Sequence, residues 1–313
     1  MNSEYLLEAF DASHYSKFNV LYQDAFGKTM SAPEFKRRFD TGSAGFEFVG
    51  FIAILRNTGE AVGFYGVFPL KIKVGQTVLP AAVSGDTMTH TAHRKKGLFG
   101  RLATMTYEKC KELGIVLIYG FPNHQSYHGL VHTLGWHHVN DMNDWNLTLR
   151  FKISPIPKIL KFASFLLPIY TRYRHRILKK YSIFNINSFN NSNGDKYGIV
   201  FRDSEFITYK KSNERLFIKI EGVVIWLRLS DVLWVGDFND LDKVSKPVIS
   251  KLKRLARLLG YNTIRFAVNR EIMLPKAMLE FKAWKPIPIC LLYLNEELKS
   301  HPFLFTAADF DTW

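Results

Sequence analysis

Three basic residues stand directly before a glycine in the segment SGDTMTHTAHRKKGLFGRL, residues 84–102. The side chains of Arg94, Lys95 and Lys96 could close over an anion. Gly97 lets the backbone approach a ligand closely because glycine has no side chain. A helix that began just after Gly97 would add unpaired amide groups and the positive end of its dipole. These residue types in this order predict a site for a phosphate or diphosphate group.

A strand and a helix must position this loop. Residues 78–83 are apolar and partly β-branched, as expected for a buried strand, and Leu102, Met105 and Leu113 mark the apolar face of a helix after the loop. The GxxxxGK[ST] phosphate loop is absent, and so is the GxGxxG dinucleotide fingerprint after a first strand. The anion site therefore belongs to another class.

The segment RKKGLF, residues 94–99, with Gly100 following, matches the pattern RxxGx(G/A) at every position but the last, and it resembles the pyrophosphate loop of the GNAT family of N-acyltransferases. Phe99 stands where that family usually has Gly or Ala. An apolar strand at 115–120 and the stretch FPNHQSYHGLVHTLGW, residues 121–136, are similar to the family's segment after its fifth strand. The resemblance implies an enzyme that uses acyl-coenzyme A as acyl donor and needs no metal.

The resemblance also implies which residues hold coenzyme A. They are Met88, Thr89, Arg94, Lys95, Lys96, Gly97, Leu98, Phe99, Gly100, Arg101, Asn123 and Ser126. Asn123 and Ser126 would bond the pantetheine arm, and the alternative for both is a plain helix N-cap.

Acyl transfer to an amine needs a base, and in the family it is often a carboxylate on the strand before the phosphate loop. Asp86 stands there, as base or substrate contact, or merely as a turn cap or ion-pair partner. His90 could do the same work with a better matched pKa, or be a hydrogen-bonded loop histidine. The family's usual acid is a tyrosine at a position that Val131 occupies here. Tyr127 is the candidate substitute, and a core tyrosine is its alternative.

The organisation predicts an α+β fold of two tandem GNAT-like lobes, each a mixed, largely antiparallel sheet flanked by helices. Residues 1–150 would form the lobe with the acyl-CoA site, 151–196 a linker and 197–313 a second, degenerate lobe. Residues 5–39 are expected to be helical, and Pro69 to separate two strands. The second lobe has the acidic segment 237–242 in place of the basic loop, so three carboxylates without a compensating cation would face a diphosphate there.

The blocks SGDTMTH, RKKGLF, LGW and the C-terminal AADFD resemble tandem acyltransferases that act on nucleotide-linked amino sugars for bacterial surface polysaccharides. The acceptor expected from this resemblance is a dTDP- or UDP-linked amino sugar, acylated with an acetyl or short hydroxyacyl group. Asp309 and Asp311 would contact the acceptor amine, or else be solvated. A peptidoglycan-type aminoacyl transferase and a non-catalytic acyl-CoA-binding protein are the alternatives.

The net charge of +14 suits anionic small molecules, and the spread of the basic residues argues against nucleic acid. Two cysteines and the lack of a signal peptide or an apolar run of ~20 residues favour the cytoplasm. His124, His128 and His132 share a helical face, but no metal is expected because HExxH is absent. The basic, apolar stretch 158–180 is expected to be a linker helix, with peripheral membrane contact as the alternative.

Overall fold

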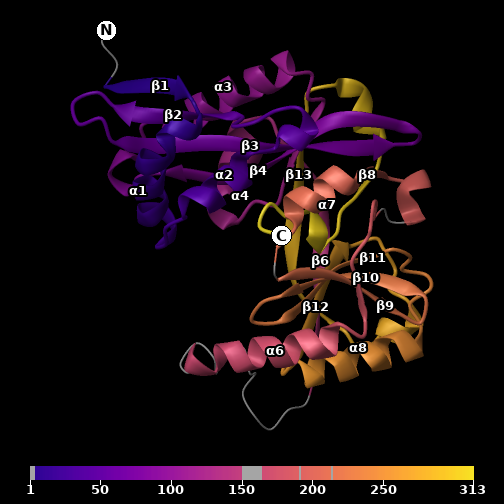
Figure 1. Cartoon of the computed structure of the whole chain (residues 1–313). Helices are drawn as coiled ribbons and strands as arrows, with labels where there is room; N and C mark the ends of the chain where they lie inside the picture. Colours follow the sequence, from indigo (N-terminus) through magenta and orange to yellow (C-terminus); the bar gives the residue numbers. More distant parts are fainter. Residues whose placement is uncertain (1–3, 150–163, 190–191, 213) are drawn as a thin grey trace. The chain divides into compact units, whose positions relative to one another are not determined.

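The computed structural model describes residues 4–149, 164–189, 192–212 and 214–313 (Figure 1). The chain divides into two compact units that exchange segments. Unit 1 contains residues 1–139, 288–301 and 312, and unit 2 contains 140–287, 302–311 and 313. The division expected from the sequence, at residues 150 and 196, lacks this exchange, and residues 151–163 of the expected linker lie outside the described ranges.

The sheet of unit 1 is antiparallel at one side and parallel at the crossover that precedes the anion loop. Strands β1, β2, β3 and β4 pair antiparallel in that order, β4 pairs parallel with β5 through a helical crossover, and β5 pairs antiparallel with β13. The bounds are β1 Tyr5–Ala9, β2 Gly50–Leu55, β3 Ala61–Val74, β4 Thr77–Thr89, β5 Leu117–Gly120 and β13 Lys282–Tyr293.

The helices of unit 1 are α1 Tyr15–Phe26, α2 Ala32–Phe39, α3 Leu98–Glu112 and α4 His124–Thr133. Aromatic rings join α1 and α2 to the sheet. Phe64 of β3 is fully buried, and its ring centroid lies 4.5 Å from that of Phe10, 5.1 Å from that of Phe18 and 5.7 Å from that of Phe39. Tilted and edge-to-face ring contacts of this kind bury much apolar area and hold both helices on one face of β3.

Two local predictions in this unit are wrong. Residues 5–9 are a strand rather than the start of a helical region, because Tyr5 to Ala9 pair with Leu55 to Phe51 of β2. Pro69 lies inside a continuous β3, opposite Ala82 of β4. Pairing of β3 with β2 ends at Gly66. Residue 69 therefore has no β2 residue opposite it, and the missing amide of Pro69 removes no hydrogen bond between β3 and β2.

Unit 2 repeats the plan of unit 1. Strands β9, β10 and β11 pair antiparallel, α8 crosses over to β12 in parallel with β11, and β12 pairs antiparallel with β6. The bounds are β6 His137–Thr148, α6 Leu167–Leu178, β7 Ser182–Ile183, β8 Gly198–Val200, α7 Ser204–Lys210, β9 Arg215–Ile220, β10 Val223–Leu229, β11 Leu233–Phe238, α8 Lys246–Leu258, β12 Thr263–Asn269 and β14 Phe303–Leu304.

The core of unit 2 lies under α8. Leu252 and Leu255 of α8 are fully buried, as are Ile225, Val235 and Ile264 of the sheet. The predicted α+β fold, with mixed sheets flanked by helices, is confirmed. Within the described ranges, no helix is both long and apolar enough to cross a bilayer.

Candidate functional site

The predicted anion loop joins β4 to α3 and ends in two residues with positive φ. Lys95 has φ 61° and Gly97, the N-cap of α3, has φ 73°. A Cβ atom built at Gly97 or Gly100 would meet no atom within 4 Å. The backbone at the start of α3 is therefore open to a ligand, and the first-turn amide groups point out of the helix there.

A cavity of about 1170 Å³ lies over this helix start. The end of β4, the loop, the first turns of α3 and one face of α4 form its walls. Its lining residues are Leu7, Ala25, Phe26, Thr87, Met88, Thr89, His93, Arg94, Lys95, Gly97, Leu98, Phe99, Gly100, Arg101, Thr104, Met105, Asn123, Gln125, Ser126, Gly129 and Thr133. The volume and the concave, mixed polar and apolar lining are those of a small-molecule site.

The structure brings all the predicted coenzyme A residues except Lys96 to this cavity. The Lys96 Nζ atom lies 3.3 Å from Glu4 Oε1 and 5.8 Å from the centre of the Tyr5 ring. These contacts raise the pKa of Lys96, the hydrogen bond to Tyr5 more than that to Glu4. Arg94 remains at the cavity, where its Nε donates to the backbone oxygen of Thr89 at 3.3 Å.

Phe99, which departs from the family pattern, is accommodated by a glycine that the sequence reasoning missed. A Cβ at Gly129 of α4 would lie 3.1 Å from the Phe99 ring, so a larger residue there would make the ring shift by a few tenths of an ångström. The ring also lies edge-on to Tyr65, with centroids 5.5 Å apart. The cavity wall thus has a large residue on α3 facing a small one on α4.

Asp86 lies at a β-bulge at the entrance to the loop. Asp86 and Thr87 together oppose the single residue Tyr65 of β3, and Asp86 has φ 53°. Its side chain is 8% exposed and accepts a hydrogen bond from Arg38 Nε in an ion pair. The Arg38 guanidinium also lies 4.6 Å from the centre of the Phe68 ring. Asp86 itself is not part of the cavity lining, which begins at the next residue.

His90 is held by both ring nitrogens. Its Nδ1 accepts from the amide of Ala92 at 3.2 Å, and its Nε2 lies 3.6 Å from Asp24 Oδ1. A neutral imidazole that accepts at Nδ1 carries its proton at Nε2, so no lone pair is left to take a proton from an amine. In this arrangement the predicted alternative, a hydrogen-bonded loop histidine, fits His90 better than a base.

Tyr127 points away from the cavity. The cavity face of α4 carries Ser126 and Gly129, whereas Tyr127 lies on the opposite side, where it packs against the core of unit 1. Its hydroxyl is 2.9 Å from His138 Nδ1. The structure therefore gives Tyr127 no access to a leaving group in the cavity. Asn123 is the N-cap of α4, with its Oδ1 accepting from Gln125 and Ser126 amides at 2.9 and 3.1 Å.

Two other tyrosines, Tyr65 and Tyr107, belong to the core of unit 1 and do not line the cavity. Tyr65 and Tyr107 share a hydrogen bond of 2.7 Å, and Trp136 Nε1 donates to the Tyr107 hydroxyl at 2.8 Å. Burial raises the pKa of Tyr65 to about 12 and that of Tyr107 further. Burial likewise raises the pKa of the Cys110 thiol to about 12, so none of these groups ionises near neutral pH.

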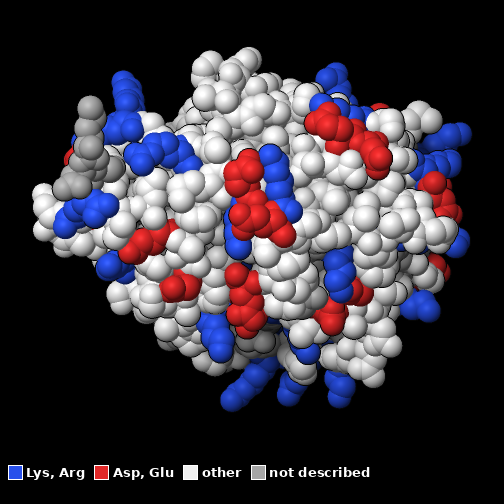
Figure 2. Space-filling view, turned by 90° about the horizontal axis from the view of Figure 1, so that it is seen from above, with Lys and Arg blue, Asp and Glu red and all other residues white. Residues whose placement is uncertain are grey.

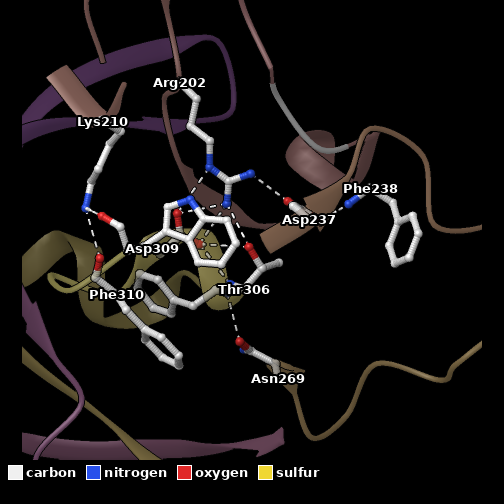
Figure 3. A network of polar contacts seen from close by, with 10 residues as sticks. Arg202, Lys210, Asp237, Phe238, Asn269, Thr306, Asp309 and Phe310 are labelled. Atoms are coloured by element: carbon white, nitrogen blue, oxygen red, sulfur yellow. Dashed lines mark hydrogen bonds and ion pairs between the residues drawn. The ribbon is translucent and has the colours of Figure 1, made fainter. Parts of the chain in front are cut away.

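The predicted acceptor contact Asp309 lies instead in a buried network of unit 2 (Figure 3). Arg202 Nη2 donates to both Asp309 oxygens, at 2.8 and 2.9 Å, and Arg202 Nη1 donates to Asp237 at 2.6 Å. The Asp309 side chain is fully buried, so an acceptor amine cannot reach it in this structure. Asp311 is half-buried, also in unit 2, and is not among the residues that line the unit 1 cavity.

The acidic segment of unit 2 is also arranged differently from the prediction that three carboxylates lack a cation. Asp237 is a residue of β11 that pairs with Arg202, and Asp240 pairs with Lys243 at 2.9 Å. Burial raises the pKa of Asp237 while Arg202 opposes that shift, and the hydrogen bond from Lys243 lowers the pKa of Asp240.

Basic and acidic side chains are interspersed on the face shown in Figure 2, with no continuous basic band. His128 and His132 of α4 have ring centroids 4.8 Å apart. Across the described ranges, no three His, Cys, Asp or Glu side chains converge in an arrangement that could hold a metal ion.

Comparison with known proteins agrees with this geometry. Residues 8–139 match the family of the Acetyltransferase (GNAT) domain. No curated protein sequence matches the chain. Three crystal structures similar to it, each at 11% identity and over 93% of the chain, are a GCN5-related N-acetyltransferase from Kribbella flavida (TM-score 0.59, 71% of that chain), a probable N-acyltransferase from Enterococcus faecalis (0.59, 73%) and a GCN5-related N-acetyltransferase from Anabaena variabilis (0.55, 73%).

At that identity the structural likeness establishes the fold, and the sequence match covers the loop, α3 and α4 that form the cavity. Residues 8–139 match the acetyltransferase (GNAT) domain, and this match supports a CoA-dependent acyltransferase activity for the chain.

Proposed function

We propose that this chain moves an acyl group from acyl-coenzyme A to the primary amine of a nucleotide-linked amino sugar. The observation that carries the proposal is the cavity at the start of α3, where Gly97 and Gly100 leave the backbone open and Arg94, Lys95 and Arg101 line the wall. A diphosphate needs main-chain donors at close range and mobile cations around them, and this site offers both.

The residues at the cavity fit coenzyme A along its length. The loop and the first turn of α3 would hold the diphosphate, and the exposed Arg94 and Lys95 would neutralise it. Ser126 and Gln125 of α4 face the same cavity and can bond the amides of the pantetheine arm. When bound, coenzyme A supplies a thioester whose carbonyl carbon is open to attack by an amine.

Asp86 is the best-placed candidate to act on the acceptor amine. It is the carboxylate nearest in sequence to the cavity wall formed by Thr87 and Thr89, and its ion pair with Arg38 fixes its position. It can accept a proton from an ammonium group, directly or through water, or hold that group by an ion pair. His90 lacks a free lone pair in this arrangement, so it is the second candidate.

No tyrosine lines the cavity within the part of the chain that the structure describes. The thiolate therefore leaves without a tyrosine acid in this proposal. The amides and dipole at the start of α3 supply positive potential, and positioning of the amine against the thioester supplies most of the rate increase.

An anionic acceptor is supported by the charge beside Asp86. Helix α2 ends with Lys36, Arg37 and Arg38, and Arg38 contacts Asp86 directly. A nucleotide diphosphate on the sugar would meet these cations while the amine approaches the carboxylate.

The experiment is an acylation assay on the full chain with acetyl-CoA and a panel of acceptors: dTDP- and UDP-linked amino sugars, free amino sugars, a polyamine and charged tRNA. Thiol release can be followed with a disulfide reagent because Cys110 and Cys290 are both buried. We expect acylated nucleotide sugar by mass spectrometry, and much slower reaction of the free amino sugar. Acylation of the free sugar or polyamine alone would overturn the acceptor class, and binding of acetyl-CoA without any acylation would overturn the catalytic proposal.

A further inference from the structure

The chain between Asp144 and Asp195 contains no Asp or Glu, whereas Lys and Arg occur in it repeatedly. Helix α6, residues 167–178, is the described helix of this segment and belongs to unit 2. Figure 1 shows it beside α8. Nothing in the proposed acylation reaction uses α6.

One side of α6 is fixed to unit 2. Tyr170 and Leu178 are buried, and the Tyr170 hydroxyl donates to the Leu259 backbone oxygen at 2.8 Å. The Tyr173 hydroxyl donates to the Leu258 backbone oxygen at 2.9 Å. Two hydrogen bonds to the end of α8 and two buried side chains prevent α6 from rolling, so its opposite side stays turned outward.

That outward side carries the exposed residues Ile169, Arg172 and Arg176, whose spacing of three and four places them along one line of the helix. Exposed Phe165 lies just before α6 in the 3-10 turn Ser164–Leu166, and exposed Lys179 is the C-cap residue of α6. We call these five residues the stripe. Phe165 is 77% exposed and Ile169 65%, and the neighbouring Leu167 is 50% exposed. Apolar side chains thus lie at one end of the stripe and cations at the other.

We propose that this stripe of α6 docks on the surface of an anionic lipid bilayer. Large apolar side chains exposed beside cations can enter the headgroup region while Arg and Lys contact lipid phosphates. The lack of carboxylates in the segment removes repulsion from that surface. A second copy of this chain is a poor partner, because it would bring another net charge of +14 against the stripe.

The test is co-sedimentation of the full chain with vesicles of phosphatidylcholine alone or with 30% phosphatidylglycerol. We expect binding to the anionic vesicles only, weakened by salt. Arg172→Glu combined with Arg176→Glu should lower vesicle affinity at least tenfold. The matched control is Lys109→Glu with Lys111→Glu on α3, which changes the net charge equally, and it should bind nearly as the parent does.

The apolar part of the stripe has its own control. Phe165→Ser with Ile169→Ser should lower affinity at unchanged net charge, whereas Leu279→Ser, which removes an equally exposed side chain elsewhere in unit 2, should not. Each variant should keep its thermal midpoint and its acylation rate without vesicles.

Three results would overturn the proposal. If the stripe variants and the control variants bound anionic vesicles equally well, the attraction to the vesicles would come from the net charge of the protein and not from the stripe. Binding to polyglutamate but not to vesicles would indicate an acidic protein partner. A dimer that Ile169→Ser dissociates, as measured by light scattering, would make the stripe an interface between copies.

Discussion

The strands that lead into the two crossover helices carry the same local arrangement but face different surroundings. In unit 1, β4 bulges at Asp86, which pairs with Arg38, and Arg38 lies on the ring of Phe68 of β3. In unit 2, β11 bulges at Gly236 and the next residue, Asp237, pairs with Arg202, whose guanidinium lies 6.0 Å from the Trp226 ring of β10.

What differs is the space in front of each bulge. In unit 1 the residues after Asp86 line the cavity. In unit 2 a second carboxylate, Asp309, binds the arginine, and the Trp313 indole lies so close that a Cβ at Gly236 would meet its ring at 2.3 Å. Lys210 holds this tail through the backbone oxygens of Phe310 and Trp313, at 2.9 and 3.3 Å. One bulge faces a substrate-sized cavity, and the other is filled by the chain itself.

The helix starts differ in the same sense. Helix α3 begins at an open glycine, whereas α8 begins at Ser245 with Pro247 in its first turn, so one amide donor is missing. The smaller cavity there, about 570 Å³, includes Asp242 in its lining. We therefore expect one coenzyme A per chain, because the start of α8 has no glycine, lacks one amide donor and has Asp242 beside it, although Lys246 and Lys276 also line that cavity.

Replacing each arginine should distinguish the ion pairs of Arg202, which we expect to stabilise the fold, from the Arg38–Asp86 pair, which we expect to act in acylation. Arg202→Met leaves two buried carboxylates close together, so the free energy of unfolding should fall by about 3–5 kcal/mol. Arg38→Met breaks a more accessible pair and should cost less stability while it slows acylation. Urea unfolding of both variants measures the loss of unfolding free energy. Equal losses in the two variants would contradict the view that the Arg202 pairs are structural and the Arg38 pair is functional.

Adding a side chain at the open glycine should close the unit 1 site. Gly97→Glu puts a carboxylate where the diphosphate is proposed to bind, and coenzyme A affinity should fall about a hundredfold or more in calorimetry. Gly75→Glu is the control: Gly75 has a similar φ of 58°, and a Cβ there also meets no atom within 4 Å, but it lies at the β3–β4 turn. If both variants bind alike, the loop is not the diphosphate site.

Replacing the aspartate at the open bulge tests its role in turnover. Asp86→Asn keeps the shape but cannot take a proton, so turnover should drop roughly a hundredfold or more while coenzyme A affinity stays nearly unchanged. A loss confined to the acceptor KM would make Asp86 a binding residue. Unchanged kinetics would shift the test to His90, despite its occupied nitrogens.

The strand, loop and helix within residues 78–113 could be predicted from the sequence because the signals for them are local. Arg94, Lys95 and Gly97 of this loop line one cavity, whereas Lys96 lies against Glu4 and Tyr5, and anion binding at the loop stays a prediction. The wrong assignments depend on partners distant in sequence. Nothing near Asp309 indicates that it would bury itself against Arg202, and nothing near residue 5 reveals pairing with Leu55.

Side-chain direction on α4 was a different kind of error. Tyr127 was chosen by its distance from Val131, which places both on one helical face, but that face turned out to be the buried one. The pairing of Phe99 with Gly129 could have given the orientation, since a bulky residue at a usually small position needs a small neighbour. Such complementarity is visible only once the two helices are known to touch.

The helix caps near the two arginine pairs give the smallest expected effect. Helix α2, which carries Arg38, begins with a capping box in which Ser31 and Glu34 bond each other's backbone, and α7, after Arg202, begins at Asp203, which accepts from the Phe206 amide at 2.9 Å. Ser31→Ala should cost about 1 kcal/mol of unfolding free energy. The hydrogen bonds from Ser31 lower the pKa of Glu34, so its contribution is present above its unfolded value of 4.5 and is lost as pH falls through the lower folded value.

The Ser31→Ala variant should therefore differ from the parent at neutral pH and approach it in acid, as measured by urea unfolding across that range. Because the cap fixes only the start of α2, and the Phe39 ring at the other end is locked against Phe64, Arg38 should keep its place and the acylation rate should change little. A large loss of activity with a small loss of stability would show that the Arg38–Asp86 pair is held by the cap of α2 rather than by the aromatic core. The bulge at Asp86 in unit 1 would then be less rigid than the bulge at Gly236 in unit 2.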